Sequence, residues 1–233
     1  MTNYTQWKSL VDLHEYSAIP DSVENQSFAW YPFDQYDTAT TSGISDESPN
    51  DNTLDQGQIS GYTDINGVQA GLFDGGNDHL YGPQFSDIEP ATAFIVAEMD
   101  SDADTSDSQW LIETATNDAA FGLNWFGGEG WQLRGDDGVF GSSDNTVKLF
   151  TCIWDGSSGT LRENGSVTAD SANISFSTVN GIEIGAIDGH DNSGAFWDGA
   201  IGEVILFDDV RGSNEIGEVE DYLNEKWELG LSL

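Results

Sequence analysis

The chain has 233 residues, with 42 Asp and Glu against 6 Lys and Arg, and its formal net charge at pH 7 is −36. Nucleic acids and anionic lipid surfaces are bound through Lys and Arg, so a charge of this sign argues against both as partners. The chain also carries 8 Trp, 7 Tyr and 12 Phe, whereas disordered acidic chains are poor in aromatic residues. The composition predicts a folded domain with an acidic surface suited to molar salt, where the Debye length is about 3 Å.

Residues 1–24 differ in pattern from the rest of the chain. Trp7, Leu10 and His14 lie roughly at helical spacing, and Pro20 ends the pattern. We interpret this segment as an N-terminal arm, which either packs on its own domain or docks into a larger assembly. No basic cluster precedes an apolar stretch here, and no apolar run in the chain approaches the ~20 residues that span a bilayer. The sequence therefore predicts neither a signal peptide nor a transmembrane segment.

From residue 28 onward, short apolar or alternating runs are separated about every ten residues by Gly, Asn, Asp and Ser, a pattern typical of a β-sandwich. The single cysteine, Cys152, lies in one of these runs, so no internal disulfide can form and we expect it in the core. The stretch 42–58 reads as a long surface loop. The clearest expected strands are 93–97, 110–112, 121–125 and 147–154.

Two turns and one helix complete the expected elements. Asp155-Gly156 and Asn164-Gly165 supply positive φ at little cost, which predicts a hairpin after Trp154. Ser213 is the expected N-cap of the C-terminal helix. Four apolar residues at helical spacing predict that one face of this helix lies on the sandwich: Ile216, Val219, Leu223 and Trp227.

Three stretches taken together resemble the concanavalin A-like, laminin-G-like jelly-roll family. They are Phe73-Asp74-Gly75-Gly76-Asn77-Asp78-His79-Leu80, the hairpin 154–167 with its Glu163-Asn164-Gly165 turn, and the final strand 196–207 with the helix after it. The resemblance implies an all-β, two-sheet antiparallel jelly-roll sandwich, with a short N-terminal arm (1–24) and a jelly-roll domain (25–233) that ends in one helix. It also implies that rim loops bind sugars, proteins or calcium, with catalysis only in some branches.

The candidate sugar site combines tryptophans with Gly, Asp and Asn. Tryptophan faces stack on sugar rings while carboxylates and amides accept hydroxyl hydrogen bonds, and glycines let a ligand approach the backbone. The alternative is that Trp125 and Trp131 face the core from paired strands. A second acidic turn at residues 188–192 is a further candidate. The candidate ligand-binding residues are Trp125, Trp131, Asp136, Asp137, Asp191 and Asn192.

Metal binding and catalysis rest on weaker patterns. Asp100, Asp102 and Asp104 alternate as oxygen ligands of calcium do, but the Gly and distal Glu of an EF-hand are missing. Calcium or another divalent cation is thus the candidate cofactor, and none is required. Some jelly-roll glycosidases carry two acids on one strand. Glu98 with Asp100 is the nearest match, but the pattern ends in Asp instead of Glu. Such a match arises easily by chance among 42 acids, so we expect no catalytic residue and no enzyme.

These features favour a protein of a virion surface, such as a capsid spike, decoration or tail-fibre component of a haloarchaeal tailed virus. The expected partners are other virion proteins through residues 1–24 and a glycan or glycoprotein of the host surface, with self-association in the assembly and no membrane insertion. A lectin-like domain of cellular origin is the first alternative. A jelly-roll glycosidase that uses Glu98 and Asp100 is the second.

Overall fold

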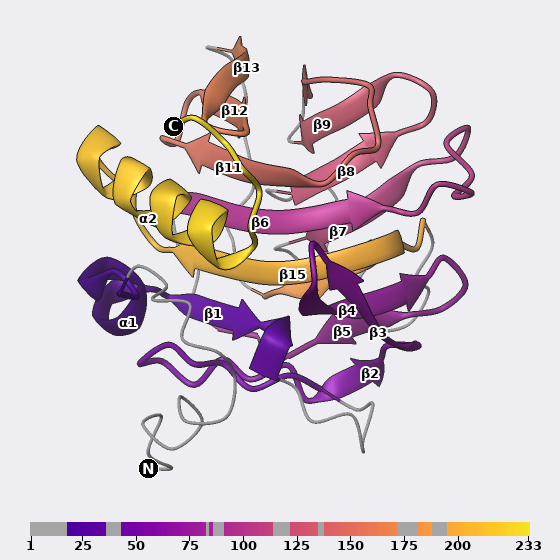
Figure 1. Cartoon of the computed structure of the whole chain (residues 1–233), viewed down its shortest axis with the longest axis horizontal. Coiled ribbons are helices and arrows are strands. Elements are labelled where there is room, and N and C mark those ends of the chain that lie inside the picture. Colours follow the sequence, from indigo (N-terminus) through magenta and orange to yellow (C-terminus); the bar gives the residue numbers. More distant parts are fainter. Residues whose placement is uncertain are drawn as a thin grey trace.

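Two antiparallel β-sheets stacked on each other, with a helix on the outer face of one of them, form the molecule (Figure 1). The computed structural model describes residues 18–35, 43–82, 84–85, 91–113, 122–134, 138–171, 181–187 and 195–233. The predicted all-β sandwich with a C-terminal helix is confirmed. Residues 1–17 of the expected arm lie outside the described residues.

The larger sheet is built around β15, the long final strand that the sequence predicts. Strand β15 pairs with β6 along one edge, and its other edge pairs with β4 through residues 198–201 and with β1 through residues 203–206. The eight strands follow the order β13-β12-β11-β6-β15-β4-β3, with β1 beside β15. They are β1 (Ala29–Pro32), β3 (Gly61–Ile65), β4 (Val68–Asp74), β6 (Ala91–Met99), β11 (Lys148–Trp154), β12 (Gly159–Glu163), β13 (Ser166–Ser171) and β15 (Asp198–Phe207).

The smaller sheet has seven strands in the order β10-β9-β8-β7-β14-β5-β2. Its middle strands, β7 to β9, are the predicted runs around residues 110 and 123, and all pairings are antiparallel. A bulge interrupts β7 between Trp110 and Ile112. The strands are β2 (Gln56–Gln58), β5 (His79–Tyr81), β7 (Gln109–Glu113), β8 (Gly122–Phe126), β9 (Gly130–Arg134), β10 (Val139–Phe140) and β14 (Glu183–Ile184).

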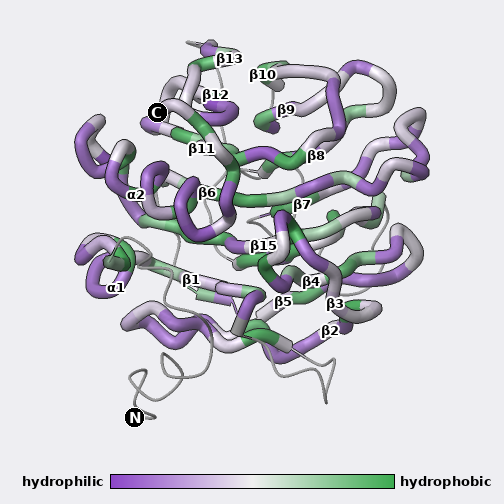
Figure 2. Tube along the Cα trace, in the orientation of Figure 1, coloured by the Kyte–Doolittle hydropathy of each residue, from purple (hydrophilic) through white to green (hydrophobic). Residues whose placement is uncertain are grey.

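The main core lies between the sheets. Alternate residues of facing strands fill it, because successive side chains of a strand point to opposite faces. Ile95 and Ile201 come from the larger sheet and Leu123 from the smaller one, and all three have no exposed surface. Cys152 is buried in the same cluster, as expected. Figure 2 shows apolar segments concentrated in the middle strands and polar segments in the connecting loops.

Helix α2 (Ser213–Lys226) covers the outer face of the larger sheet and closes a second core (Figure 1). Its N-cap is Gly212, one residue before the expected Ser213, because the Glu215 carboxylate accepts the backbone N–H of Gly212 at 3.1 Å. The short helix α1 (Asp21–Gln26) contributes Val23, which is fully buried in this second core. The four apolar residues predicted to face the sandwich, from Ile216 to Trp227, are all buried here.

The predicted hairpin is present between β11 and β12, and a second tight turn follows it. Asn164 and Gly165 adopt φ values of 50° and 78° and join β12 to β13, the combination that a two-residue hairpin loop requires. The Asn164 side chain also accepts the backbone N–H of Leu149 at 3.0 Å, which ties the turn to β11. The 3-10 helix η2 (Phe33–Gln35) follows β1.

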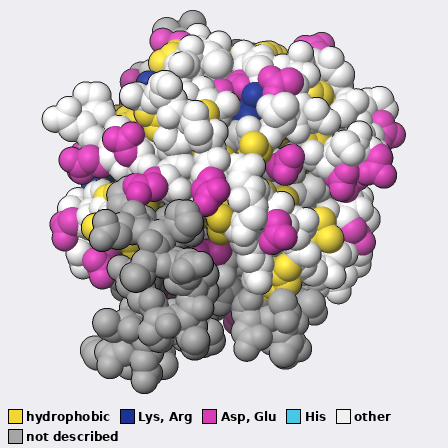
Figure 3. Space-filling model, viewed as in Figure 1, with side chains coloured by type: hydrophobic (Ala, Val, Ile, Leu, Met, Phe, Trp, Pro, Cys, Tyr) yellow, Lys and Arg dark blue, Asp and Glu magenta, His cyan; other side chains and the backbone are white. Residues whose placement is uncertain are grey.

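The expected loop 42–58 is mostly irregular, with one bridge between Ile44 and Leu54 before β2 begins. None of the described helices is both long and apolar enough for a bilayer. Asp and Glu side chains are spread over the face that Figure 3 shows, with few Lys or Arg between them.

Candidate functional site

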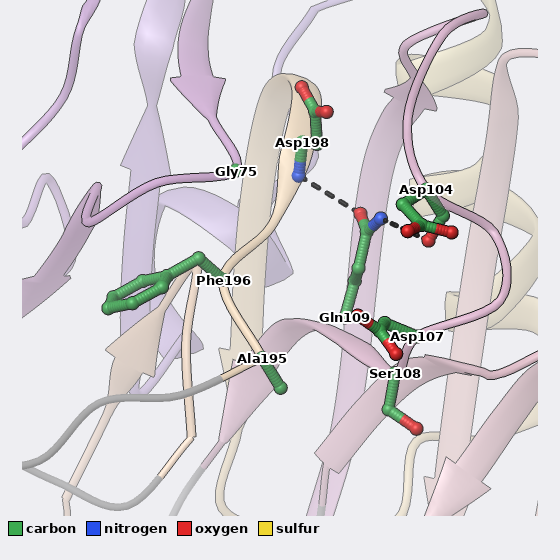
Figure 4. Close-up of a pocket in the computed structure, with 8 residues that line it drawn as sticks. All are labelled: Gly75, Asp104, Asp107, Ser108, Gln109, Ala195, Phe196 and Asp198. Atoms are coloured by element: carbon green, nitrogen blue, oxygen red, sulfur yellow. Dashed lines mark hydrogen bonds between the residues drawn. The ribbon is translucent and has the colours of Figure 1, made fainter.

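A pocket of about 190 Å³ opens at one rim of the sandwich, where loops from both sheets meet. It lies between the β4–β5 turn, the β6–β7 loop and the segment that enters β15. Figure 4 shows its lining. The residues are Gly75, Asp104, Asp107, Ser108, Gln109, Ala195, Phe196 and Asp198.

Gln109 joins two walls of this rim pocket, the β6–β7 loop and the segment that enters β15. Its amide oxygen accepts the backbone N–H of Asp198 at 3.1 Å, and its amide nitrogen donates to the backbone carbonyl of Asp104 at 3.2 Å (Figure 4). The side chain is 95% buried, so both bonds are shielded from water. Gln109 thereby fixes the start of β15 against the β6–β7 loop.

Backbone hydrogen bonds also hold the segment that enters β15, residues 195–198, in place. Ala195 accepts the backbone N–H of Trp110 at 2.9 Å, and Trp197 donates to the carbonyl of Gly185 at 2.8 Å. Gly75 adopts φ 70°, and a Cβ there would lie 2.9 Å from that of Asp198. Glycine is therefore required for this close approach. Both sheets thus fix the pocket's shape before any ligand arrives.

Three carboxylates give the rim pocket its chemistry. Asp104 and Asp107 are exposed, whereas Asp198 is half-buried. Burial, together with the charges of nearby acids at positions 100, 102 and 74, raises the pKa of Asp198 above its ordinary value. Hydrogen bonds from the Ser106 hydroxyl and backbone N–H lower the pKa of Asp104. The pocket therefore presents carboxylate oxygens toward solvent through Asp104 and Asp107.

Aromatic rings continue from the rim pocket onto the smaller sheet. Phe196 is directed away from Gln109 and lies 6.0 Å, between ring centroids, from His79 (Figure 4). His79 is stacked on Tyr81 at 5.4 Å with an interplanar angle of 4°. All three rings are partly exposed. Carboxylates beside a row of partly exposed rings suit a ligand with hydroxyl groups and apolar ring faces.

The tryptophans of the expected sugar site lie elsewhere. Trp125 and Trp131 are 4% and 0% exposed, pack edge to face at 5.6 Å, and belong to the main core. Their indole N–H groups donate to the backbone carbonyls of Thr105 and Asp144. The structure therefore supports the alternative in which both tryptophans face the core from paired strands, because β8 and β9 turn these rings inward. Asp136, Asp137, Asp191 and Asn192 lie outside the described residues.

The expected metal-binding acids lie in the β6–β7 loop, and all three are exposed. Asp100 accepts the backbone N–H of Asp102 at 3.3 Å, and Asp104 accepts that of Ser106 at 3.0 Å. These are local turn bonds of the kind that Asp makes in loops. Within the described part of the chain, no group of three or more His, Cys, Asp or Glu side chains could hold a metal ion.

The expected acid pair sits on the larger sheet. Glu98 is the penultimate residue of β6 and shares the outer face with Phe94 and Val96, which pack beneath α2. Burial and the charge of Asp100 raise the pKa of Glu98. Asp100 follows on the same side at the rim, where its backbone N–H donates to the carbonyl of Asp198. The two acids thus lie outside the lining of the rim pocket.

Comparisons with known proteins give the fold a context. No family model matches the sequence, and a comparison with curated proteins finds no match. Among solved structures, domain 4 of AbnA, a GH43 extracellular arabinanase from Geobacillus stearothermophilus in complex with arabinotriose, aligns with TM-score 0.60 and 13% identity over 84% of this chain and 98% of that domain. The chain shares the β-sandwich fold of that domain.

A Trypanosoma rangeli sialidase in complex with the inhibitor DANA aligns with TM-score 0.57 and 12% identity, over 84% of this chain and 32% of that one. A mutant of that sialidase with trans-sialidase activity aligns with TM-score 0.60 and 12% identity, over 91% and 34%. The chain thus spans about a third of the sialidase. These matches correct the expectation that the chain is not an enzyme, because the fold occurs in chains of carbohydrate-cleaving proteins and gives no ground for that exclusion.

The sequence reasoning missed a polar row on the outer face of the smaller sheet. Leu123, Trp125, Trp131 and Leu133 point into the core, so the residues between them point out. The alternation Leu-Asn-Trp in β8 and Trp-Gln-Leu in β9 is the signal that could have revealed this row, once the tryptophans were assigned to the core. The outer residues are Trp110, Asn124 and Gln132, which lie opposite one another on three strands, with Glu113, Glu183 and Arg134 nearby.

Proposed function

We propose that this chain is a glycan-binding domain whose ligand occupies the rim pocket. The observation that carries the proposal is the grouping of open carboxylates, the Ser108 hydroxyl and the Gln109 amide around one preformed hollow beside partly exposed rings. Asp104 and Asp107 would accept sugar hydroxyls, and Phe196 would contact a ring face. A volume of about 190 Å³ is below the ~300–1,000 Å³ of drug-sized sites, so we expect the pocket to take one sugar unit of a longer glycan.

Two findings support the choice of a glycan. The matched arabinanase domain is in complex with arabinotriose, and the Trypanosoma rangeli sialidase also matches in a complex with sialic acid. The pocket also lies on loops at the rim of a rigid sandwich, where binding residues can vary without disturbing the core. A phosphate-bearing ligand is disfavoured, since none of the lining residues is Lys or Arg.

The test is binding of labelled protein to a glycan array in about 1 M salt, where surface charges are screened. We expect a defined set of glycans to bind the intact chain. The double variant D104A/D107A should bind these glycans at least about tenfold more weakly, the effect of losing one hydrogen bond to a charged group. The variant F196A should also bind them more weakly, because it removes the contact with the sugar's ring face. The control D208A/D221A also removes two exposed carboxylates, away from the pocket, and should bind normally. No binding, or equal binding by all variants, would contradict the proposal.

We further propose that such a domain acts on a virion surface and attaches through its N-terminal segment. The support is the sequence alone: the acidic composition and residues 1–24. Because Val23 is part of the second core, the variant to test lacks residues 1–17 and keeps α1. It should bind glycan normally but fail to be incorporated into particles. Normal incorporation of this variant would contradict the proposed attachment.

A further inference from the structure

We infer that the outer face of the seven-stranded sheet carries a second binding site, which recognises the carboxylate of an acidic sugar through Arg134. The site is centred on the row of Trp110, Asn124 and Gln132, one residue from each of β7, β8 and β9. It is separate from the rim pocket, whose lining includes none of these residues.

Asn124 is the first observation behind this inference. The residue is 1% exposed, yet among the described residues neither its amide nitrogen nor its amide oxygen has a hydrogen-bond partner. The amide oxygen of its neighbour Gln132, a residue 4% exposed, also has none in the described part of the chain. Leaving a buried polar group unpaired costs about 1–3 kcal/mol, so two adjacent amides in this state point to a partner that the described residues do not supply. The groups open to such a partner are one donor, the amide nitrogen of Asn124, and two acceptors, the amide oxygens of Asn124 and Gln132.

Arg134 is the second observation. Four of the five described basic residues form ion pairs with carboxylates: Lys148, Arg162, Arg211 and Lys226. Arg134 forms none within the described residues, although the chain carries 42 acids. Its guanidinium lies 6.0 Å from the centroid of the Trp110 ring instead. A guanidinium held on an aromatic face keeps its N–H groups available for a carboxylate, which it binds in a bidentate manner.

A glycine, Gly122, lies next to both Trp110 and Arg134 in the sheet. A Cβ at Gly122 would lie 2.5 Å from the Trp110 ring, so the ring fills the space over this glycine. Gly122 is directly opposite Arg134 on β9 and opposite Glu113 on β7. The absence of a side chain at this position leaves room for the Trp110 ring beside Arg134.

The charges around Arg134 define the class of ligand. Glu113 and Glu183 lie opposite each other on β7 and β14, on the same outer face and two or more strands away from Arg134. A carboxylate must therefore sit at the Arg134 end, away from the glutamates, while hydroxyl groups can pair with the amides of Asn124 and Gln132. A sugar acid carries both kinds of group on one ring. A neutral sugar would leave Arg134 without a carboxylate, and a simple anion would leave the amides unused.

The inference rests on the proposed function in taking the ligand to be a glycan, and its test separates the two. Binding by the full chain is measured by calorimetry in about 1 M salt. The probes are tetramers of galacturonic acid and of glucuronic acid, each beside its carboxyl-reduced neutral counterpart. We expect at least one acid form to bind about tenfold or more tightly than its neutral form. R134Q should abolish the preference for the acid form. R134K should keep part of it, because Lys retains the positive charge but cannot bind a carboxylate through two parallel N–H groups as Arg does.

Two further variants sharpen the test. N124L removes the unpaired amide, so it should weaken binding of the acid form while leaving the melting temperature equal or higher. N214D is the charge control: like R134Q, it makes the net charge of the chain more negative by one, but at an exposed position of α2. It should leave binding unchanged.

Equal affinity for the acid and neutral forms of both sugars, or a preference that survives R134Q, would overturn the inference. A lower melting temperature with unchanged binding in N124L would do the same, since it would assign Asn124 to bound water within the fold. If only this inference is wrong, array glycans still bind and D104A/D107A still weakens them. If the proposed function is wrong, array glycans fail to bind, or D104A/D107A binds them normally.

Discussion

At the scale of single residues, Glu203 shows how an acid is accommodated in the interior. It has no exposed surface and accepts the indole N–H groups of Trp30 at 2.6 Å and Trp227 at 3.0 Å, and the hydroxyl of Tyr222 at 3.0 Å. The ammonium of Lys226 lies 2.8 Å from it. Burial disfavours a charged lysine, but the charges of Glu203 and other neighbours outweigh this effect and hold the pKa of Lys226 well above its ordinary value.

Replacing Glu203 with Gln should destabilise the fold by about 3–5 kcal/mol, the usual cost of breaking a buried ion pair. The new amide would place a donor among three donors and remove the charge that faces Lys226. Denaturant unfolding measures the change. The control E218Q removes an exposed carboxylate from α2 and should stay within about 0.5 kcal/mol of the unmodified chain. Equal stability of both variants would show that the cluster contributes nothing to folding.

Asp155 gives a prediction about pH. Hydrogen bonds from the backbone N–H of Ser157, and from the hydroxyl and backbone N–H of Ser158, lower the pKa of Asp155 to about 2, against about 3.9 in an unfolded chain. Since the folded pKa is the lower one, the carboxylate stabilises the fold above about pH 4, and this stabilisation is lost as the pH falls toward 2. The melting temperature of D155A should therefore be lower than normal at pH 6 and should converge with the normal value near pH 2. A difference that persists unchanged at pH 2 would contradict this account.

At the scale of elements, the contact between α2 and the larger sheet depends on a glycine. A Cβ at Gly202 would lie 2.8–2.9 Å from the ring of Trp227, the fully buried residue that ends the helix. Gly202 also lies at the register shift in β15 between Ile201 and Glu203. The bulge and the missing side chain together let the indole ring lie against the sheet.

G202A should destabilise the protein by about 1–3 kcal/mol, because the added methyl group must displace a close-packed ring. Thermal unfolding and the fluorescence of the buried tryptophans report the change. Gly217 is a suitable control, since a Cβ there meets nothing within 4 Å and G217A should keep or raise stability in the helix. An unchanged melting temperature in G202A would show that α2 docks without this contact.

Most elements could be predicted from the sequence because their signals are local. The apolar runs of β6 and β11, the Asn164-Gly165 turn and the spacing of apolar residues in α2 each arise within one segment. The site could not be predicted in the same way, because Gln109, Asp104 and Asp198 meet only when three segments converge at the rim. Tryptophans next to glycines look alike in sequence whether they face the core or solvent, and only the pairing of β8 with β9 decides between these orientations.

At the scale of the whole molecule, the chain has a net charge of −36, and few Lys or Arg side chains are present to balance its surface acids. Four of the five described basic residues are held in ion pairs, so they cannot neutralise the remaining surface acids. Repulsion between these acids opposes the compact state unless salt screens it. The adaptation to high salt predicted from composition therefore has a direct physical test.

The melting temperature should rise between about 0.1 M and about 1 M salt, as the Debye length falls from about 10 Å to about 3 Å. NaCl and KCl should act alike if screening is the cause. The measurement is a series of thermal scans at constant pH. A melting temperature that stays constant or falls over this range would show that surface repulsion does not limit stability.

The central claim is that the rim pocket binds a sugar unit, and the most direct measurement is a map of amide chemical shifts during titration with the glycan that binds most tightly on the array. We predict the largest shifts at Gly75, Ser108, Gln109 and Ala195, which line the pocket, and small shifts across α2. Shifts that leave the residues of the rim pocket unchanged, or no shifts at saturating glycan, would contradict the claim.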